Sequence, residues 1–140
     1  MPKPLVIAVI DGQGGGIGAH VIEKLRKGLS EAVEIIGLGT NAIATSLMMK
    51  AGANKGATGE NAIVRCVASA DLIVGSWAIL MAHSMMGEIT PGMAEAVAAS
   101  PAQKFLLPLG LPRTEVVGIA PEPFPHLIEK LVDRIGRYNH

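Results

Sequence analysis

The chain has 140 residues, and its 12 basic and 12 acidic side chains leave a formal net charge of zero. This balance argues against a binding surface for nucleic acid or for an anionic membrane, and the single cysteine, Cys66, excludes a disulfide framework within the chain. Because no apolar stretch reaches the about 18 residues of a membrane span, and because the N-terminus lacks a secretory signal pattern, we expect a cytoplasmic protein with a single domain, residues 1–140.

The first predicted elements are a strand and a helix separated by a glycine-rich loop. Leu5 to Ile10 is continuously apolar and rich in β-branched side chains, as in a strand that is covered on both faces. Apolar side chains then recur every four residues from Ile17 to Leu29, which predicts an amphipathic helix. The first turn of such a helix has unpaired amides and partial positive charge, so the loop before it is expected to hold phosphate. The expected contact residues are Asp11, Gly12, Gln13, Gly14, Gly15, Gly16, Ile17 and Gly18.

The spacing of these glycines fits two patterns. Gly14-x-Gly16-x-x-Ala19 matches the dinucleotide fingerprint with alanine in the last position, and Gly12-x-x-x-Gly16-x-Gly18 resembles the variant found in short-chain dehydrogenases. Those dehydrogenases also need a tyrosine followed four residues later by a lysine. The single tyrosine, Tyr138, is followed by two residues only, which excludes that activity. The alternative to phosphate binding is a tight turn whose glycines only allow close packing and positive φ.

Strands and helices alternate along the rest of the chain. We expect strands at 33–38, 71–75, 104–109 and 115–119, helices at 41–51, from about 59 to 68, at 90–99 and in the closing segment through Ile135, and a flexible connection at 52–61. This alternation predicts an α/β fold, a three-layer Rossmann-like doubly wound sheet of five mainly parallel strands in the order 2-1-3-4-5.

The ligand crevice of such a sheet opens between the carboxyl ends of the first and third predicted strands, where the strand order reverses. Gly75 and Ser76 are expected to line it opposite the glycine loop, and Thr40 and Asn41, after the second strand, to contact the sugar or base. A typical NAD site has an acidic residue at this last place, and no arginine follows to receive a 2′-phosphate. The sequence therefore predicts a nucleotide or a dinucleotide such as NAD(H) as cofactor, without identifying its base.

A second glycine-rich loop offers another anion site. Lys55, Thr58 and the helix that begins near Gly59 are placed to hold a phosphate or a carboxylate, and Asn54 or Asn61 to contact a polar edge of the ligand. The alternative is a mobile linker in which Thr58 only caps the helix.

Groups suited to catalysis are sparse. His83 follows the third predicted strand and has Ser84 and Glu88 nearby, so it is the one candidate for a general base, although a lone histidine is more often structural or exposed. The histidines and carboxylates show no metal-ligand spacing, and no metal site is expected.

The segment 77–93 is rich in methionine and too apolar for an ordinary surface loop. Methionine fills irregular contacts, so we expect this segment to form the interface of a homo-oligomer. An intramolecular core and a lid over the nucleotide crevice are the alternatives.

Several short motifs identify a resemblance to a family. They are Thr40-Asn41-Ala42, Lys50-Ala51-Gly52-Ala53, Gly56-Ala57-Thr58-Gly59-Glu60-Asn61-Ala62-Ile63 and Gly87-Glu88-Ile89-Thr90-Pro91. With the glycine loop, they make nearly the whole chain resemble a small uncharacterised bacterial family of single-domain Rossmann-like proteins. The resemblance implies a Rossmann-like fold of unknown function and supplies no active site. Trp77 and His83 stand where that family is expected to have smaller or amide residues, which makes catalysis by His83 less attractive.

The sequence as a whole predicts an oligomeric module that binds a nucleotide as a small-molecule ligand and senses it, with neither nucleic acid nor membrane as a partner. One alternative is a small oligomeric enzyme acting on a phosphorylated or carboxylated metabolite. The other is an interaction module that has lost its ligand. The residues leave open whether the protein is an enzyme.

Overall fold

The computed structural model describes residues 3–29 and 32–138, and within these residues five parallel strands form one sheet. The elements are β1 (Val6–Asp11), α1 (Gly16–Gly28), β2 (Glu34–Gly39), α2 (Ala42–Ala51), β3 (Lys55–Thr58), α3 (Glu60–Val67), β4 (Leu72–Ser76), the 3-10 helix η1 (Trp77–Leu80), α4 (Pro91–Ala99), β5 (Gln103–Leu107) and α5 (Phe124–Gly136). The strand order is β3-β2-β1-β4-β5, and every neighbouring pair is parallel.

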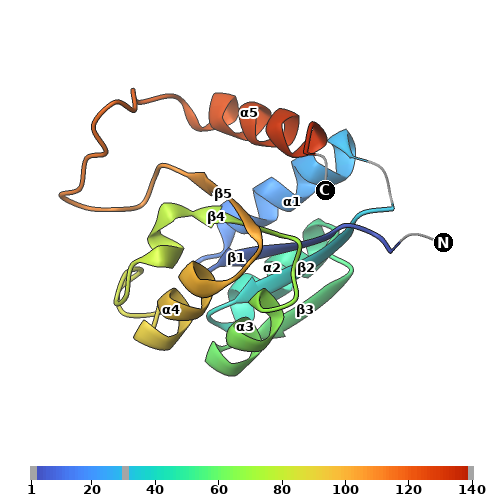
Figure 1. The fold of residues 1–140 in the computed structure, drawn as a ribbon, viewed down its shortest axis with the longest axis horizontal. Coiled ribbons are helices and arrows are strands. Elements are labelled where there is room, and N and C mark those ends of the chain that lie inside the picture. The colour runs from blue at the N-terminus through green and yellow to red at the C-terminus, as the bar shows by residue number, and fades with distance from the viewer. Residues whose placement is uncertain (1–2, 30–31, 139–140) are drawn as a thin grey trace.

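Helices cover both faces of the sheet, with α1 and α5 on one side and α3 and α4 on the other (Figure 1). The central strand β1 serves both faces, because successive side chains of a strand point in opposite directions. Ile7 and Val9 pack in the first cluster and Ala8 and Ile10 in the second. None of the four is more than 2% exposed. This confirms the predicted α/β class with a parallel sheet. In the described part of the chain, no helix has the length and apolar character needed to cross a membrane.

The predicted strand order 2-1-3-4-5 is wrong at both edges of the sheet. The fifth predicted strand, 115–119, is irregular, because no strand of the described residues pairs with it. Gly118 has a φ of 95°, which ends any extended run, and Val117 is 92% exposed. The fifth strand is instead β3, which lies beside β2 at the other edge of the sheet.

The segment that contains β3, residues 52–61, is therefore not the flexible connection that its glycines and amides suggest. β3 is only four residues long and pairs with β2 from Lys55 to Thr58. A Cβ on Gly56 would lie 2.8 Å from Met49 Sδ and 2.9 Å from Thr45 Cγ2, so α2 packs directly over this strand. Glycine is needed here for close packing rather than for flexibility.

Two helices begin with a side-chain cap. Asn41 precedes α2, and its Oδ1 accepts a hydrogen bond from the amide of Ala44 at 2.9 Å. Thr90 precedes α4, and its Oγ1 accepts from the amide of Met93 at 3.1 Å, with Pro91 as the first helical residue. These caps fix where α2 and α4 begin and hence the direction in which each helix leaves the sheet.

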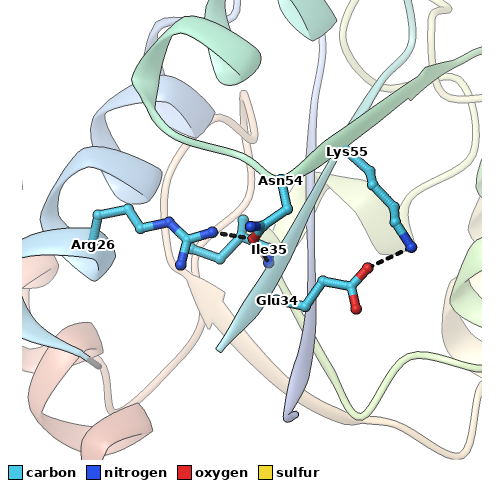
Figure 2. A network of polar contacts seen from close by, with 5 residues as sticks. All are labelled: Arg26, Glu34, Ile35, Asn54 and Lys55. Atoms are coloured by element: carbon cyan, nitrogen blue, oxygen red, sulfur yellow. Dashed lines mark hydrogen bonds and ion pairs between the residues drawn. The ribbon is translucent and has the colours of Figure 1, made fainter. Parts of the chain in front are cut away.

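At the amino end of the sheet, Arg26 joins α1 to the strands β2 and β3 (Figure 2). Its guanidinium donates to the carbonyl oxygens of Gly52 and Val33, each at 2.9 Å, and to Asn54 Oδ1. The same Asn54 oxygen accepts from the amide of Ile35 at 2.8 Å. A single side chain thus connects the end of α1, the end of α2 and the starts of two strands.

Candidate functional site

A cavity of about 240 Å³ lies at the carboxyl ends of β1 and β4, on the glycine loop between β1 and α1. The loop residues from Asp11 to Ile17 form one wall, and Ser76, Ala78, Met85 and Gly110 complete the lining. The strand order reverses between β1 and β4, because β2 lies on one side of β1 and β4 on the other. Doubly wound sheets bind their ligands at this place.

The loop leaves amides unpaired at the start of α1. Asp11 is 5% exposed, and its carboxylate accepts from the amides of Gly12 at 2.8 Å and Gly18 at 2.6 Å. No side chain caps α1, since its N-cap is Gly15. Among the hydrogen bonds of the described residues, none is donated by the amide of Gly16 or Ile17. Two amides at the positive end of α1 therefore remain available to an anion.

The glycines of the loop differ in what they allow. Gly15 has a φ of 74°, and a Cβ on it would lie 2.7 Å from the Cα of Ala44 in α2. A Cβ on Gly12 would lie 2.9 Å from an oxygen of Glu88. Gly14 and Gly16 have no neighbouring atom within 4 Å of such a Cβ. Gly15 is thus required by its φ and by the backbone of α2, and a Cβ on Gly12 would displace neighbouring side chains, whereas Gly14 and Gly16 leave the approach to the cavity open.

Glu88 was not predicted to contact the glycine loop; it binds the loop from outside the lining of the cavity. One oxygen of its carboxylate, Oε1, accepts from the amide of Gln13 at 2.7 Å, from Asn41 Nδ2 at 3.0 Å and from the hydroxyl of Thr40. Among the described residues, no hydrogen bond is formed by its other oxygen, Oε2. Thr40 and Asn41, which were predicted to contact the sugar or base, hold a carboxylate of the protein instead, and neither lines the cavity. The sequence contained one indication of such a residue, because no acidic residue follows β2, where a typical NAD site has one.

The two carboxylates beside the loop have opposite pKa shifts. Burial raises the pKa of Asp11, against the lowering effect of its bonds to the amides of Gly18 and Gly12, and the charge of Glu88 raises it further. The hydrogen bonds from Thr40 and from the amide of Gln13 lower the pKa of Glu88. Glu88 is accordingly the carboxylate that is ionised at neutral pH with little cost, whereas ionised Asp11 is disfavoured by its burial.

This difference predicts how stability depends on pH. The folded pKa of Asp11 lies above its ordinary value of 3.8, so its contribution is fully present below that value and is lost as pH rises through the raised folded pKa. In urea unfolding from pH 3.8 towards neutrality, the stability of the native protein relative to Asp11→Asn should therefore fall. Glu88 titrates in both proteins, so the difference reports Asp11. A difference that grows with pH would contradict this assignment.

The two predicted residues at the end of β4 divide between the cavity and the core. Ser76 lines the cavity and is 4% exposed, and its hydroxyl donates to the carbonyl of Leu109 and accepts from the amide of Ala78 at 3.1 Å. Gly75 does not line the cavity. A Cβ on it would lie 3.0 Å from the carbonyl oxygen of Ile10 in β1, so this glycine allows close strand packing.

The residues predicted for a second anion site do not gather in one place. Lys55 Nζ lies 2.8 Å from Glu34 Oε1 at the amino end of the sheet, as Figure 2 shows. That ion pair raises the pKa of Lys55. Thr58, at the other end of β3, has its hydroxyl 2.7 Å from that of Thr45. Gly59 is the N-cap of α3, and Asn61 is the second residue of that helix.

His83 and the segment 77–93 are distributed over the surface and the core. His83 is exposed and lines neither this cavity nor the larger one beside α5. Ile79 and Met93 are buried in the cluster beneath α3 and α4, whereas Met86 is 93% exposed. Part of the segment is therefore intramolecular core. In the part of the chain that the structure describes, no three His, Cys, Asp or Glu side chains come together as a metal site.

Comparison with known proteins places the chain in a family. A family model described as a domain of unknown function (DUF3842) matches residues 6–140. Searches of the curated proteins and of the solved structures found no significant match. The match begins at the first residue of β1 and includes the glycine loop, Thr40-Asn41 and Glu88. The chain belongs to this uncharacterised domain family, as its sequence motifs predicted.

Proposed function

We propose that the protein binds a nucleotide or dinucleotide in a Rossmann-like manner, with the phosphates held by the loop from Gly12 to Gly18. The observation that carries this proposal is the cavity of about 240 Å³ at the reversal of strand order, into which the bare start of α1 opens. The amides of Gly16 and Ile17 supply hydrogen bonds to a phosphate without a basic side chain. A cavity of this size suits the phosphates, while the sugar and base extend along the carboxyl edge of the sheet.

The role of Thr40 and Asn41 in this proposal differs from the one their position suggested. They bind Oε1 of Glu88 and leave Oε2 as an acceptor beside the glycine loop. Glu88 thereby supplies, from the connection between η1 and α4, the carboxylate that NAD sites usually have after the second strand. A carboxylate at this place accepts ribose hydroxyls and repels a 2′-phosphate, which favours NAD over NADP.

A pair of substitutions at Gly16 tests the proposal. Gly16→Ala adds no close contact and should leave binding intact. Gly16→Asp places a negative charge in the first turn of α1, where it stabilises the helix but repels a phosphate. A thermal-shift screen with NAD, NADP, FMN, ATP, ADP and AMP shows which of these ligands binds. A ligand at about 100 times its dissociation constant adds roughly 2.7 kcal/mol to the free energy of unfolding, which raises the melting temperature. The shift seen with the native protein should persist in Gly16→Ala and vanish in Gly16→Asp.

Two results would overturn the proposal. One is that no nucleotide raises the melting temperature of the native protein. The other is that Gly16→Asp, folded and at least as stable as the native protein, keeps the full shift. Because the aspartate is favourable for the helix itself, loss of the shift cannot be attributed to unfolding of α1.

A specific observation favours a second candidate, an interaction module that has lost its ligand. The donors of Gln13, Thr40 and Asn41 are occupied by Glu88, a residue of the protein itself. Met86 and Val117 are more than 90% exposed and offer apolar contacts to a second copy of the chain. For this candidate, the nucleotide screen gives no shift while sedimentation shows a homo-oligomer that Met86→Ser weakens.

A further inference from the structure

The connection from η1 to α4, residues 81–89, lies against the glycine loop, and we call it the strap. Figure 1 shows where it leads into α4. Met85 of the strap lines the cavity, and its Sδ would lie 2.9 Å from a Cβ on Gly12. Glu88, further along the strap, accepts a hydrogen bond from the amide of Gln13 at 2.7 Å. The strap therefore contacts the loop at two places and borders one side of the cavity.

The strap is a compact loop whose two ends are joined. The amide of His83 donates to the carbonyl of Ile89 at 2.6 Å, and the amide of Ile89 donates to the carbonyl of Ser84 at 3.2 Å. Ile89 is its one buried residue, whereas Met86 is 93% exposed. Compact loops with close ends are frequently functional, and segments with few buried side chains open more readily than the core. The strap has the construction of a loop that opens while the sheet stays folded.

The backbone of the strap is held in an unfavourable conformation. Among the described residues, five other than glycine have a positive φ, and three of them lie here: His83 at 70°, Met85 at 55° and Met86 at 56°. A fourth is Gln13, at 48°, whose amide Glu88 binds. The left-handed conformation is costly for a residue with a Cβ and persists only where surrounding contacts hold it. The closed strap therefore stores strain that its opening releases.

Glu88 supplies the contacts that oppose this strain. Its Oε1 accepts from the amide of Gln13, from Nδ2 of Asn41 and from the hydroxyl of Thr40. These donors belong to the connections that follow β1 and β2, so one side chain ties the strap to two neighbouring strand ends. Hydrogen bonds to an ionised group are stronger than those between neutral groups. Loss of this one carboxylate removes three of them at once.

We propose that the strap is a lid over the glycine loop, held closed by the carboxylate of Glu88 and biased towards opening by its own backbone strain. The closed strap leaves a cavity of about 240 Å³. A whole nucleotide reaches the carboxyl end of β2 only by displacing the strap, because Glu88 is bound there to Thr40 and Asn41. This step of ligand entry rests on the proposed function. Reclosure returns Glu88 to the loop and presents its Oε2 to the sugar.

Amide hydrogen exchange of the ligand-free protein tests the carboxylate and the strain separately. Glu88→Ala removes the three hydrogen bonds, so exchange of the amides of His83 and Ile89 should become about ten-fold faster. Met86→Asn relieves strain, because asparagine tolerates the left-handed conformation, and the same amides should exchange about five-fold more slowly. Met81→Asn is the matched control, since Met81 is also exposed but has a φ of −110°. It should leave both amides unchanged.

The amide of Asp71 shows whether opening of the strap is separate from unfolding of the protein. It donates to the carbonyl of Val6 at 3.0 Å, at the amino end of the sheet. In the native protein, the amides of His83, Ile89 and Gln13 should be equally protected, and at least about ten-fold less than that of Asp71. If they are protected as strongly as Asp71, or if either Glu88→Ala or Met86→Asn leaves the strap amides unchanged, the proposal is wrong.

Ligand entry has a separate readout. Association of NAD, measured by stopped-flow fluorescence, should be about five-fold slower in Met86→Asn than in the native protein or in Met81→Asn, because relief of strain favours the closed strap. Pyrophosphate has neither sugar nor base and fits beneath the closed strap, so its association rate should be the same in all three proteins. Equal slowing of both ligands, or no slowing of NAD, contradicts the role of the strap in entry. If NAD does not bind at all, the proposed function fails, while the exchange measurements still decide whether the strap is a lid held by Glu88.

Discussion

Replacement of Gly15 by alanine should destabilise the protein by about 3 kcal/mol, while the same replacement at Gly14 or Gly16 should change stability by less than about 0.5 kcal/mol. The three residues lie within the same loop, but only Gly15 has a positive φ, of 74°. Its added Cβ would meet the backbone of Ala44 at 2.7 Å, and the start of α2 cannot move away without losing its cap at Asn41. Backbone strain and overpacking therefore act together at this one position.

Urea unfolding followed by circular dichroism measures the three variants under identical conditions. Gly14→Ala and Gly16→Ala are the matched controls, since they add the same methyl group to the same loop. If Gly15→Ala lowers the free energy of unfolding by no more than the two control variants do, α1 and α2 are not in contact through this glycine. A large cost at Gly14 would mean that the open side of the loop is packed against something.

Replacement of Arg26 by methionine should lower the free energy of unfolding by about 2 kcal/mol. Hydrogen bonds from a charged donor contribute roughly 1.5–3 kcal/mol each when buried, and the partial exposure of this side chain reduces that sum. Methionine keeps the unbranched apolar stem but leaves the carbonyls of Gly52 and Val33 without their donor. Asn54 also loses a partner, although it keeps its bond to the amide of Ile35.

The position of Arg26 makes this variant informative about the site as well. It lies at the amino end of the sheet, opposite the glycine loop, so the thermal shift caused by a nucleotide should be unchanged even though the melting temperature of the free protein falls. Arg26→Lys retains the charge but cannot reach all three acceptors, and its stability should lie between those of the other two proteins. A methionine variant as stable as the native protein would contradict the role given to Arg26.

Most of the fold could be predicted from local sequence patterns, because the pattern of apolar residues is clearest in elements that are buried on both faces. The apolar run from Leu5 to Ile10 had to be a central strand, and Thr90-Pro91 had to begin a helix, since each depends only on neighbouring residues. The two errors arose where tertiary contacts decide. Val116 and Val117 have high strand propensity, yet no strand lies beside them. Lys55 to Thr58 has low propensity, yet the edge of β2 and the cover of α2 make it a strand.

The position of the cavity was predictable from the sequence, whereas the polar contacts beside it were not. The glycine loop follows from spacing and from the order of strand, loop and helix, and the reversal of strand order then places a cavity there. Glu88 could not be assigned in this way, because 75 residues separate it from Gln13, the residue whose amide it binds.

The arrangement of β1 between β2 and β4 also determines how the chain can fold. Every pairing in this sheet is parallel, so no two strands can join through a short hairpin, and each must wait for a helical crossover. The pairings of β1 with β2 and of β2 with β3 are complete within the first 58 residues, whereas the hydrogen bond from the amide of Val6 to Asp71 spans 65 residues. Closure of that long loop is the slower event. Until β4 arrives, the inner edge of β1 is exposed with its amides and carbonyls unpaired, and it can be joined by a strand from another chain. During synthesis, the protein is therefore most prone to misassembly after β1 has paired with β2 and before it pairs with β4.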